Sequence, residues 1–304
     1  MPILLGILAG IGLPVQTSLN ARLRKRVGSP YRASLVSFAV ALLFLLVLLV
    51  LTGQGIGVQT EKLAGAPLWI YVGGVCGVIF LTGNILLLAK LGSVRAVVLP
   101  VLGQIVMGLV VDSTGLFGVT QVELTMLRVA GAGLVAIGVV VVSLAKEGSV
   151  QTEKTKPASW AWSVFGVLAG MLSAVQTAVN GRLGALVGSP IKASVISFLV
   201  GTTLLLLLCL TQARRSASEG PREKQPWWSW LGGVLGGVYV LANVILSGKL
   251  GTGLTVIVLL VGATGGGLLV DHFGWFGVEK KPINARKALG VLLMIVGAAA
   301  IKLF

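Results

Sequence analysis

Charged and chemically reactive side chains are scarce in this chain of 304 residues. It has nine Asp and Glu, one histidine and two cysteines. Cys76 and Cys209 both lie inside apolar runs, and His272 has no partner set around it, so neither a disulfide nor a metal site is expected. No Ser/His/Asp set, metal-ligand cluster or phosphate loop is present. We therefore expect no enzyme, no metal and no cofactor.

Apolar residues are abundant instead, at 56% of the chain, with 43 glycines. Long apolar runs of this kind indicate a membrane protein. The formal charge is +15, but the lysines and arginines stand between the apolar runs rather than on an amphipathic face. This placement favours anchoring of loops at a lipid bilayer and argues against a nucleic-acid partner.

The chain is a tandem duplication, because residues 10–38 match residues 170–198 at 15 of 29 positions. Most of the matches are polar residues, glycines or the proline, which two unrelated apolar segments would not share. The correspondence continues at an offset of 159, where Asn84 meets Asn243 and Asp112 meets Asp271. A fixed period of this length indicates a repeat architecture.

Each repeat contains five runs long enough to span a bilayer, which takes ~20 apolar residues. We therefore predict an all-α polytopic membrane protein with ten transmembrane helices in two five-helix repeats. The predicted units are a first repeat (residues 1–145), a linker (146–159) and a second repeat (160–304). The predicted helices are Pro2–Asn20, Ala33–Thr52, Leu68–Ala89, Val94–Val111, Thr125–Ala145, Ser163–Asn180, Ala193–Thr211, Trp228–Ser247, Thr252–Val270 and Ala285–Leu303.

Basic residues predict the orientation. The connections after the first, third, fifth, seventh and ninth helices hold 18 Lys and Arg, and the opposite side holds six. The richer side is cytoplasmic by the positive-inside rule, which makes the linker cytoplasmic and both termini periplasmic. An odd number of helices per repeat inverts the second copy, and the basic residues change sides accordingly. Inverted repeats are typical of secondary transporters.

Each half opens with Q-T-x-x-N-x-R-L followed by V-G-S-P-x-x-A-S-x-x-S-F. On these motifs the whole chain resembles the YdcZ family of bacterial inner-membrane exporters, in its fused two-domain form. That family belongs to the drug/metabolite transporter superfamily. The resemblance implies a helical bundle with alternating access around a central cavity. Small multidrug relatives carry a Glu in their first helix, whereas here neither helix 1 nor helix 6 has a carboxylate, so the resemblance does not extend to proton-coupled drug export.

Paired amides are the candidate substrate-binding groups. Gln16 and Asn20 are four residues apart and share a helix face, and Gln176 and Asn180 repeat the pattern. Polar groups at membrane depth need partners, so these amides should face the bundle interior around the midplane. The alternative is that they form interhelical hydrogen bonds that hold the halves together. The full predicted set is Gln16, Asn20, Asn84, Gln104, Gln176, Asn180 and Asn243.

Two prolines and two acids are candidates for gating or coupling. Pro14 and Pro100 should kink their helices, as hinges or as packing features. Asp112 and Asp271 end corresponding helices in D-x-x-G-x-F-G and either cap a turn, pair with a basic residue, or act as gate or proton-relay carboxylates. Glycines spaced four residues apart are expected to serve close helix packing. They are Gly6/Gly10, Gly73/Gly77, Gly166/Gly170 and Gly232/Gly236.

The sequence thus favours a secondary transporter in the bacterial inner membrane, most simply an exporter of a small polar metabolite or drug-like molecule. A passive channel or facilitator is the alternative that an inverted bundle also allows. Amides without a membrane-embedded acid suit a polar, neutral or zwitterionic small molecule as the partner. A monomer is expected because both halves are fused, and a dimer is left open.

Overall fold

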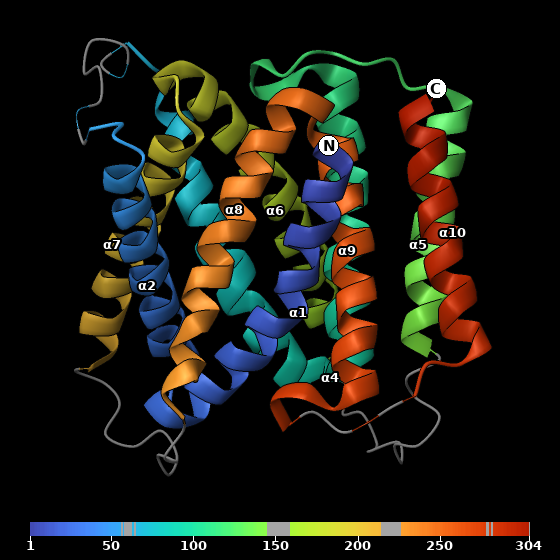
Figure 1. Ribbon diagram of the computed structural model, residues 1–304, viewed down its shortest axis with the longest axis horizontal. Coiled ribbons are helices and arrows are strands. Elements are labelled where there is room, and N and C mark those ends of the chain that lie inside the picture. The colour runs from blue at the N-terminus through green and yellow to red at the C-terminus, as the bar shows by residue number, and fades with distance from the viewer. Residues whose placement is uncertain are drawn as a thin grey trace.

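The structure is a computed structural model that describes residues 1–55, 57, 63, 65–144, 159–213, 226–277, 280 and 282–303. Every regular element in this part of the chain is helical (Figure 1). The α-helices are α1 (Pro2–Val27), α2 (Pro30–Leu51), α4 (Val72–Thr114), α5 (Met126–Leu144), α6 (Ser159–Val187), α7 (Pro190–Ala213), α8 (Leu231–Leu250), α9 (Thr252–Phe273) and α10 (Ala285–Leu303). The 3-10 turns are η1 (Leu68–Tyr71), η2 (Leu116–Gly118), η3 (Trp227–Trp230) and η4 (Trp275–Gly277).

Nine stretches of the described chain are long and apolar enough to cross a membrane, and α4 contributes two of them. The remaining helix, α10, has the same 19-residue length as α5 but carries Arg286, Lys287 and Lys302. It packs along α5 through facing glycines, Gly131 on Gly297 and Gly138 on Gly290. The predicted all-α polytopic membrane fold is confirmed. The predicted linker lies outside the described residues except for Ser159, which begins α6.

The repeated V-G-S-P motif makes a helix break in both halves. Gly28 takes φ 77°, its N–H caps α1 by donating to the Arg24 carbonyl, and Pro30 begins α2. Gly188, at φ 69°, and Pro190 do the same between α6 and α7. The predicted end of the first helix at Asn20 was wrong. The helix continues to Val27 because the buried face continues through Leu23, so most of the basic cluster lies on α1 rather than in a connection.

The predicted third and fourth helices are joined without a break in α4, which supplies two candidate membrane spans. A Cβ placed on Gly166 of α6 would lie 3.5 Å from Leu87 and 3.0 Å from Leu99, both on α4. On a straight helix those two leucines would be about 18 Å apart, at ~1.5 Å per residue. The chain therefore reverses direction between them. In the second repeat the same reversal is a true break at Gly251, with φ 77°, between α8 and α9.

The two halves exchange their first helices. In Figure 1, α1 lies against α8 and α9 of the second half, while α6 packs along both spans of α4. Glycines make these contacts close. Gly10 abuts the Leu259 carbonyl and Gly170 abuts the equivalent Pro100 carbonyl. Close backbone approach at small residues is how membrane helices gain packing energy without a hydrophobic driving force.

Two further helix pairs relate the halves. On one side α2 packs on α7, with the rings of Phe38 and Phe198 5.0 Å apart, edge to face. On the other side α5 packs on α10. Both chain termini lie at the same end of the bundle (Figure 1). Because equivalent residues make equivalent contacts, the two halves are related by an approximate two-fold arrangement.

Candidate functional site

The predicted amides of α1 and α6 lie against glycines of the opposite half. Gln16 and Asn20 of α1 face Gly236 and Gly232 of α8, where a Cβ would lie 2.7 Å from the Gln16 Nε2 and 2.5 Å from the Asn20 Oδ1. Residues four apart share a helix face on each side, so two amides of one helix meet two glycines of the other. The glycines leave the space that the amides occupy.

The second half repeats this arrangement with the roles of the halves exchanged. Gln176 and Asn180 of α6 face Gly77 and Gly73 of α4, and a Cβ on Gly77 would lie 2.7 Å from the Gln176 Nε2. Gln16 and Gln176 therefore lie at two different interfaces, α1 with α8 and α6 with α4. Each interface joins one half to the other, so a movement of one half against the other must alter both.

Several of these amide atoms have no hydrogen-bond partner among the described residues. They are the Gln16 Oε1, the Asn84 Oδ1 and both side-chain polar atoms of Asn20 and Asn180. Asn20 and Asn180 are each only 1% exposed. Leaving a buried donor or acceptor unsatisfied costs about 1–3 kcal/mol. Such buried amides are normally satisfied by an ordered water, by a bound solute or by partners in another state.

The matched asparagines Asn84 and Asn243 differ in their contacts. Asn243 on α8 accepts a 2.9 Å hydrogen bond from the Thr177 hydroxyl of α6, and its Nδ2 donates to the Tyr239 carbonyl. The equivalent residues of the first half are Asn84 on α4 and Thr17 on α1. The Thr17 hydroxyl donates to the Leu13 carbonyl four residues back, as the Thr177 hydroxyl also does to the Ser173 carbonyl at 3.1 Å. Among the described residues Thr17 has no second acceptor, and the Asn84 Oδ1 has no partner. Thr177 is 4% exposed, whereas Thr17 is exposed. The halves are equivalent in sequence but differ at this contact.

The remaining polar candidate and the two prolines make other contacts. Gln104 is buried at 3% exposure on the second span of α4. No hydrogen bond between described residues joins any two of the seven predicted amides. Pro14 lies inside α1, and the Ser18 hydroxyl donates to its carbonyl. Pro100 lies inside α4 at the close contact with Gly170.

Asp112 joins three helices at the end of α4. Its carboxylate accepts hydrogen bonds from the backbone N–H groups of Thr252 (2.8 Å) and Gly253 (2.9 Å), at the N-terminus of α9. Arg128 of α5 lies 3.5 Å away as its ion-pair partner, and both side chains are buried. An anion suits this position because the N-terminus of a helix carries partial positive charge. Asp271 lies near the end of α9 and is partly buried.

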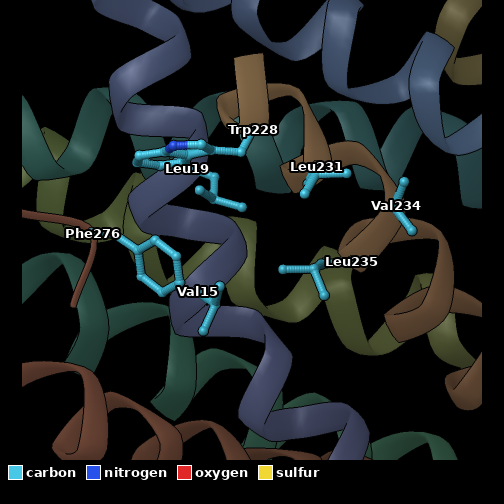
Figure 2. Close-up of a pocket in the computed structure, with 7 residues that line it drawn as sticks. All are labelled: Val15, Leu19, Trp228, Leu231, Val234, Leu235 and Phe276. Atoms are coloured by element: carbon cyan, nitrogen blue, oxygen red, sulfur yellow. The ribbon is translucent and has the colours of Figure 1, made fainter. Parts of the chain in front are cut away.

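Two features here are missing from the sequence prediction. Arg128 is one of the six basic residues counted on the periplasmic side, but its side chain is 4% exposed, and that of its equivalent Lys287 is 2% exposed. The sequence signal that could have identified them is that Arg128 and Lys287 occupy equivalent positions in the two repeats. The second feature is an apolar pocket beside α1 (Figure 2), which no motif marks.

The fold is shared with a solved protein structure. A crystal structure aligns over 98% of this chain and 96% of its own, with a TM-score of 0.64 and 18% identity. At this identity the likeness concerns the fold alone. It extends over almost the whole of both chains, so no large part of the bundle stands outside it.

Sequence comparison identifies the family. The Inner membrane protein YdcZ of Escherichia coli (strain K12) is 27% identical over 135 residues, which is 44% of this chain and 89% of that protein. That relative is therefore about the size of one half. The sequence model described as "Putative inner membrane exporter, YdcZ" matches twice, at residues 1–141 and 161–300. Since those matches cover nearly all of the sequence, the chain belongs to the YdcZ family of inner membrane exporters.

Proposed function

We propose that this chain is a secondary transporter that exports a small polar molecule by alternating access between its two halves, residues 1–145 and 160–304. One observation carries the proposal. The Thr177–Asn243 hydrogen bond closes α6 onto α8, while the equivalent Thr17 and Asn84 of α1 and α4 are not bonded to each other. A pseudo-symmetric bundle with one of two equivalent contacts made is what alternating access requires.

The closed contact continues beyond the hydrogen bond. A Cβ on Gly181 would lie 3.1 Å from the Ser247 Cβ, and one on Gly184 would lie 2.7 Å from a Val244 methyl. These residues lie toward the C-terminal ends of α6 and α8, at the end of the bundle that holds both chain termini (Figure 1). By the inverted relation, the equivalent contact of α1 with α4 belongs to the opposite end. In the proposal this state is closed at the termini end and open at the other.

The free-energy difference between the two proposed states is expected to be small. One neutral hydrogen bond contributes only about 1 kcal/mol net, so exchanging the Thr177–Asn243 bond for a Thr17–Asn84 bond changes the free energy little. A bound solute then needs only a modest difference in affinity to shift the population between the two states. In the proposal α1 and α6 link the two ends of the bundle, because each belongs to one half and packs on the other. A change of contact at one end therefore alters the contact at the other.

The unpartnered amide atoms support a polar substrate without strong net positive charge. The Gln16 Oε1 and the side chains of Asn20, Asn84 and Asn180 offer both donors and acceptors. A bare cation would call for an acid nearby, but Asp112 is already held by Arg128 and the α9 N-terminus. We propose a neutral or zwitterionic solute. The end of the bundle that is rich in Lys and Arg is cytoplasmic by the positive-inside rule, and it is the end proposed to be open. An exporter that is ready to bind its solute is open to the cytoplasm.

Transport against a gradient tests this function and separates it from a channel. A thermal-shift screen of metabolites on purified protein should first find a stabilising ligand. That ligand is then followed in proteoliposomes under an imposed ion gradient or counterflow. A transporter accumulates labelled ligand above its equilibrium level. Movement that only equalises the two sides, at a rate unaffected by ligand on the far side, would instead indicate a passive facilitator.

A further inference from the structure

An apolar pocket of about 270 Å³ opens between α1, α8 and the turns η3 and η4. Figure 2 shows its walls, with Val15 and Leu19 from α1 facing Val234 and Leu235 from α8. The Trp228 and Phe276 rings lie beside Leu19 and Val15, and those two ring centres are 5.9 Å apart. Every residue that lines the pocket is aliphatic or aromatic, so its interior suits a hydrocarbon.

The guanidinium of Arg22 is held beside this pocket by two contacts. The Arg22 Nε donates a 2.7 Å hydrogen bond to the Phe276 carbonyl. Its guanidinium carbon lies 5.3 Å from the centre of the Trp228 ring, a cation–π contact. Arg22 therefore contacts both residues that supply the aromatic walls, through the Phe276 backbone and the Trp228 ring. Nε–H is one of five guanidinium donors, so this hydrogen bond still leaves donors on the forked end for an anion.

The surroundings match a membrane–water interface. Trp227 and Trp230 beside the pocket are 74% and 40% exposed, and Arg26 lies over the Trp230 ring at 5.7 Å. Exposed tryptophans and basic side chains gather where acyl chains meet headgroups. Basic residues also attract anionic lipid at the cytoplasmic surface.

The pocket lies on a different face of α1 from the unmade Thr17 contact proposed above. Val15 lines the pocket and Thr17 carries the unmade contact, two positions later on the same helix. Two residues correspond to about 200° around an α-helix, since each turn takes ~3.6 residues. The two side chains thus leave α1 on nearly opposite faces.

We propose that this pocket binds an anionic phospholipid, with one acyl chain between α1 and α8 and the phosphate on Arg22. A guanidinium at the mouth of a hydrocarbon-lined pocket is complementary to an amphiphile with a negatively charged head. The lipid joins α1 of the first half to α8 and η4 of the second. Its binding goes beyond the transport function and depends only on insertion into the bilayer.

Thermal stability in defined lipid tests the site. Purified full-length protein is titrated with phosphatidylglycerol or with phosphatidylcholine of the same chains, and the difference in Tm gain is compared within each variant. Comparison within a variant cancels any change in its baseline stability. We expect phosphatidylglycerol to raise the Tm more in the wild type, and Arg22→Gln to abolish that difference. Arg22→Lys should keep the difference because the charge remains.

Three further measurements distinguish a lipid in the pocket from a general charge effect and from binding of the headgroup alone. Val234→Trp fills the pocket and should remove the response to both lipids. Arg286→Gln removes an exposed charge on α10, away from the pocket, and should leave the phosphatidylglycerol preference intact. Soluble glycerol phosphate, which has the head and no chain, should not stabilise. The proposal is overturned if Arg22→Gln keeps the preference, if Arg286→Gln loses it equally, or if glycerol phosphate alone reproduces the effect.

Discussion

The side-chain nitrogen of Gln16 lies 2.7 Å from where a Cβ would stand on Gly236, so α8 accommodates that amide only because residue 236 is glycine. The same relation holds between Gln176 and Gly77 at the other interface between the halves. A buried amide and a helical glycine are each unfavourable by themselves. Together they place a polar group inside the contact between the two halves.

Removal of the amides should impair transport more than stability. Gln16→Ala and Gln176→Ala each delete one polar group, and the Gln16 Oε1 already lacks a partner. We therefore expect at least a tenfold loss of transport rate for the ligand found by screening, with a Tm near wild type. Gly236→Ala should act similarly, because its methyl displaces only the end of the Gln16 side chain. Loss of transport with an equal loss of stability would assign these amides to helix association alone.

Replacement of a glycine by alanine should destabilise the protein where the added Cβ would clash with backbone, and should not where the space is open. A Cβ on Gly233 would lie 2.5 Å from the Ser37 carbonyl oxygen, so Gly233→Ala should destabilise by about 1–3 kcal/mol, as overpacking does. A Cβ on Gly265 meets nothing within 4 Å, and Gly265→Ala should be neutral or stabilising by up to ~1 kcal/mol from helix propensity. Thermal unfolding measures both. Equal Tm values for the two variants would contradict the close α2–α8 contact.

The buried Asp112–Arg128 pair should be essential for stability. Asp112→Ala leaves Arg128 buried without its counter-charge and frees two N–H groups of α9, which should cost about 3–5 kcal/mol. Adding Arg128→Met should recover part of that loss by removing the unpaired charge. The control is Glu123→Ala, an exposed acid nearby. A double variant no more stable than Asp112→Ala would argue that capping of α9, not the ion pair, dominates.

Orientation in the membrane is testable with described, exposed positions. Glu123 lies between η2 and α5, and Lys280 lies between η4 and α10. After replacement of Cys76 and Cys209, we expect Glu123→Cys to react with a membrane-impermeant thiol reagent in cells with a permeabilised outer membrane. Lys280→Cys should react only after lysis. The reverse pattern would invert the topology and turn the open end toward the periplasm.

The repeat could be read from sequence because it depends on matched residues alone. The helix break was expected between Asn20 and Ala33, and the structure places it at Gly28 and Pro30, with Gly188 and Pro190 in the second copy. The end of α1 was missed because charge was taken as a sign of a loop, whereas Arg22, Arg24 and Arg26 continue the helix. The reversal inside α4 was expected as a gap between helices.

The partners of the polar residues could not be read from sequence. Both motifs of the α1–α8 interface, amides four apart and glycines four apart, were recognised separately. Their pairing depends on the exchange of α1 and α6 between halves, which no local pattern encodes because every span is apolar on most faces. The difference between Thr17 and Thr177 lies in their tertiary contacts, and two copies of the same motif cannot express it.

Cross-linking of the two threonine–asparagine contacts tests alternating access most directly. In a chain with Cys76→Ala and Cys209→Ala, one variant carries Thr177→Cys with Asn243→Cys, and the other carries Thr17→Cys with Asn84→Cys. A short bifunctional thiol reagent is applied with and without ligand, and transport is measured before and after. The account predicts rapid cross-linking of the first pair at rest. It also predicts slower, ligand-dependent cross-linking of the second pair, with loss of transport in both cases. Failure of the second pair to cross-link under any condition in a transporting protein would contradict the account.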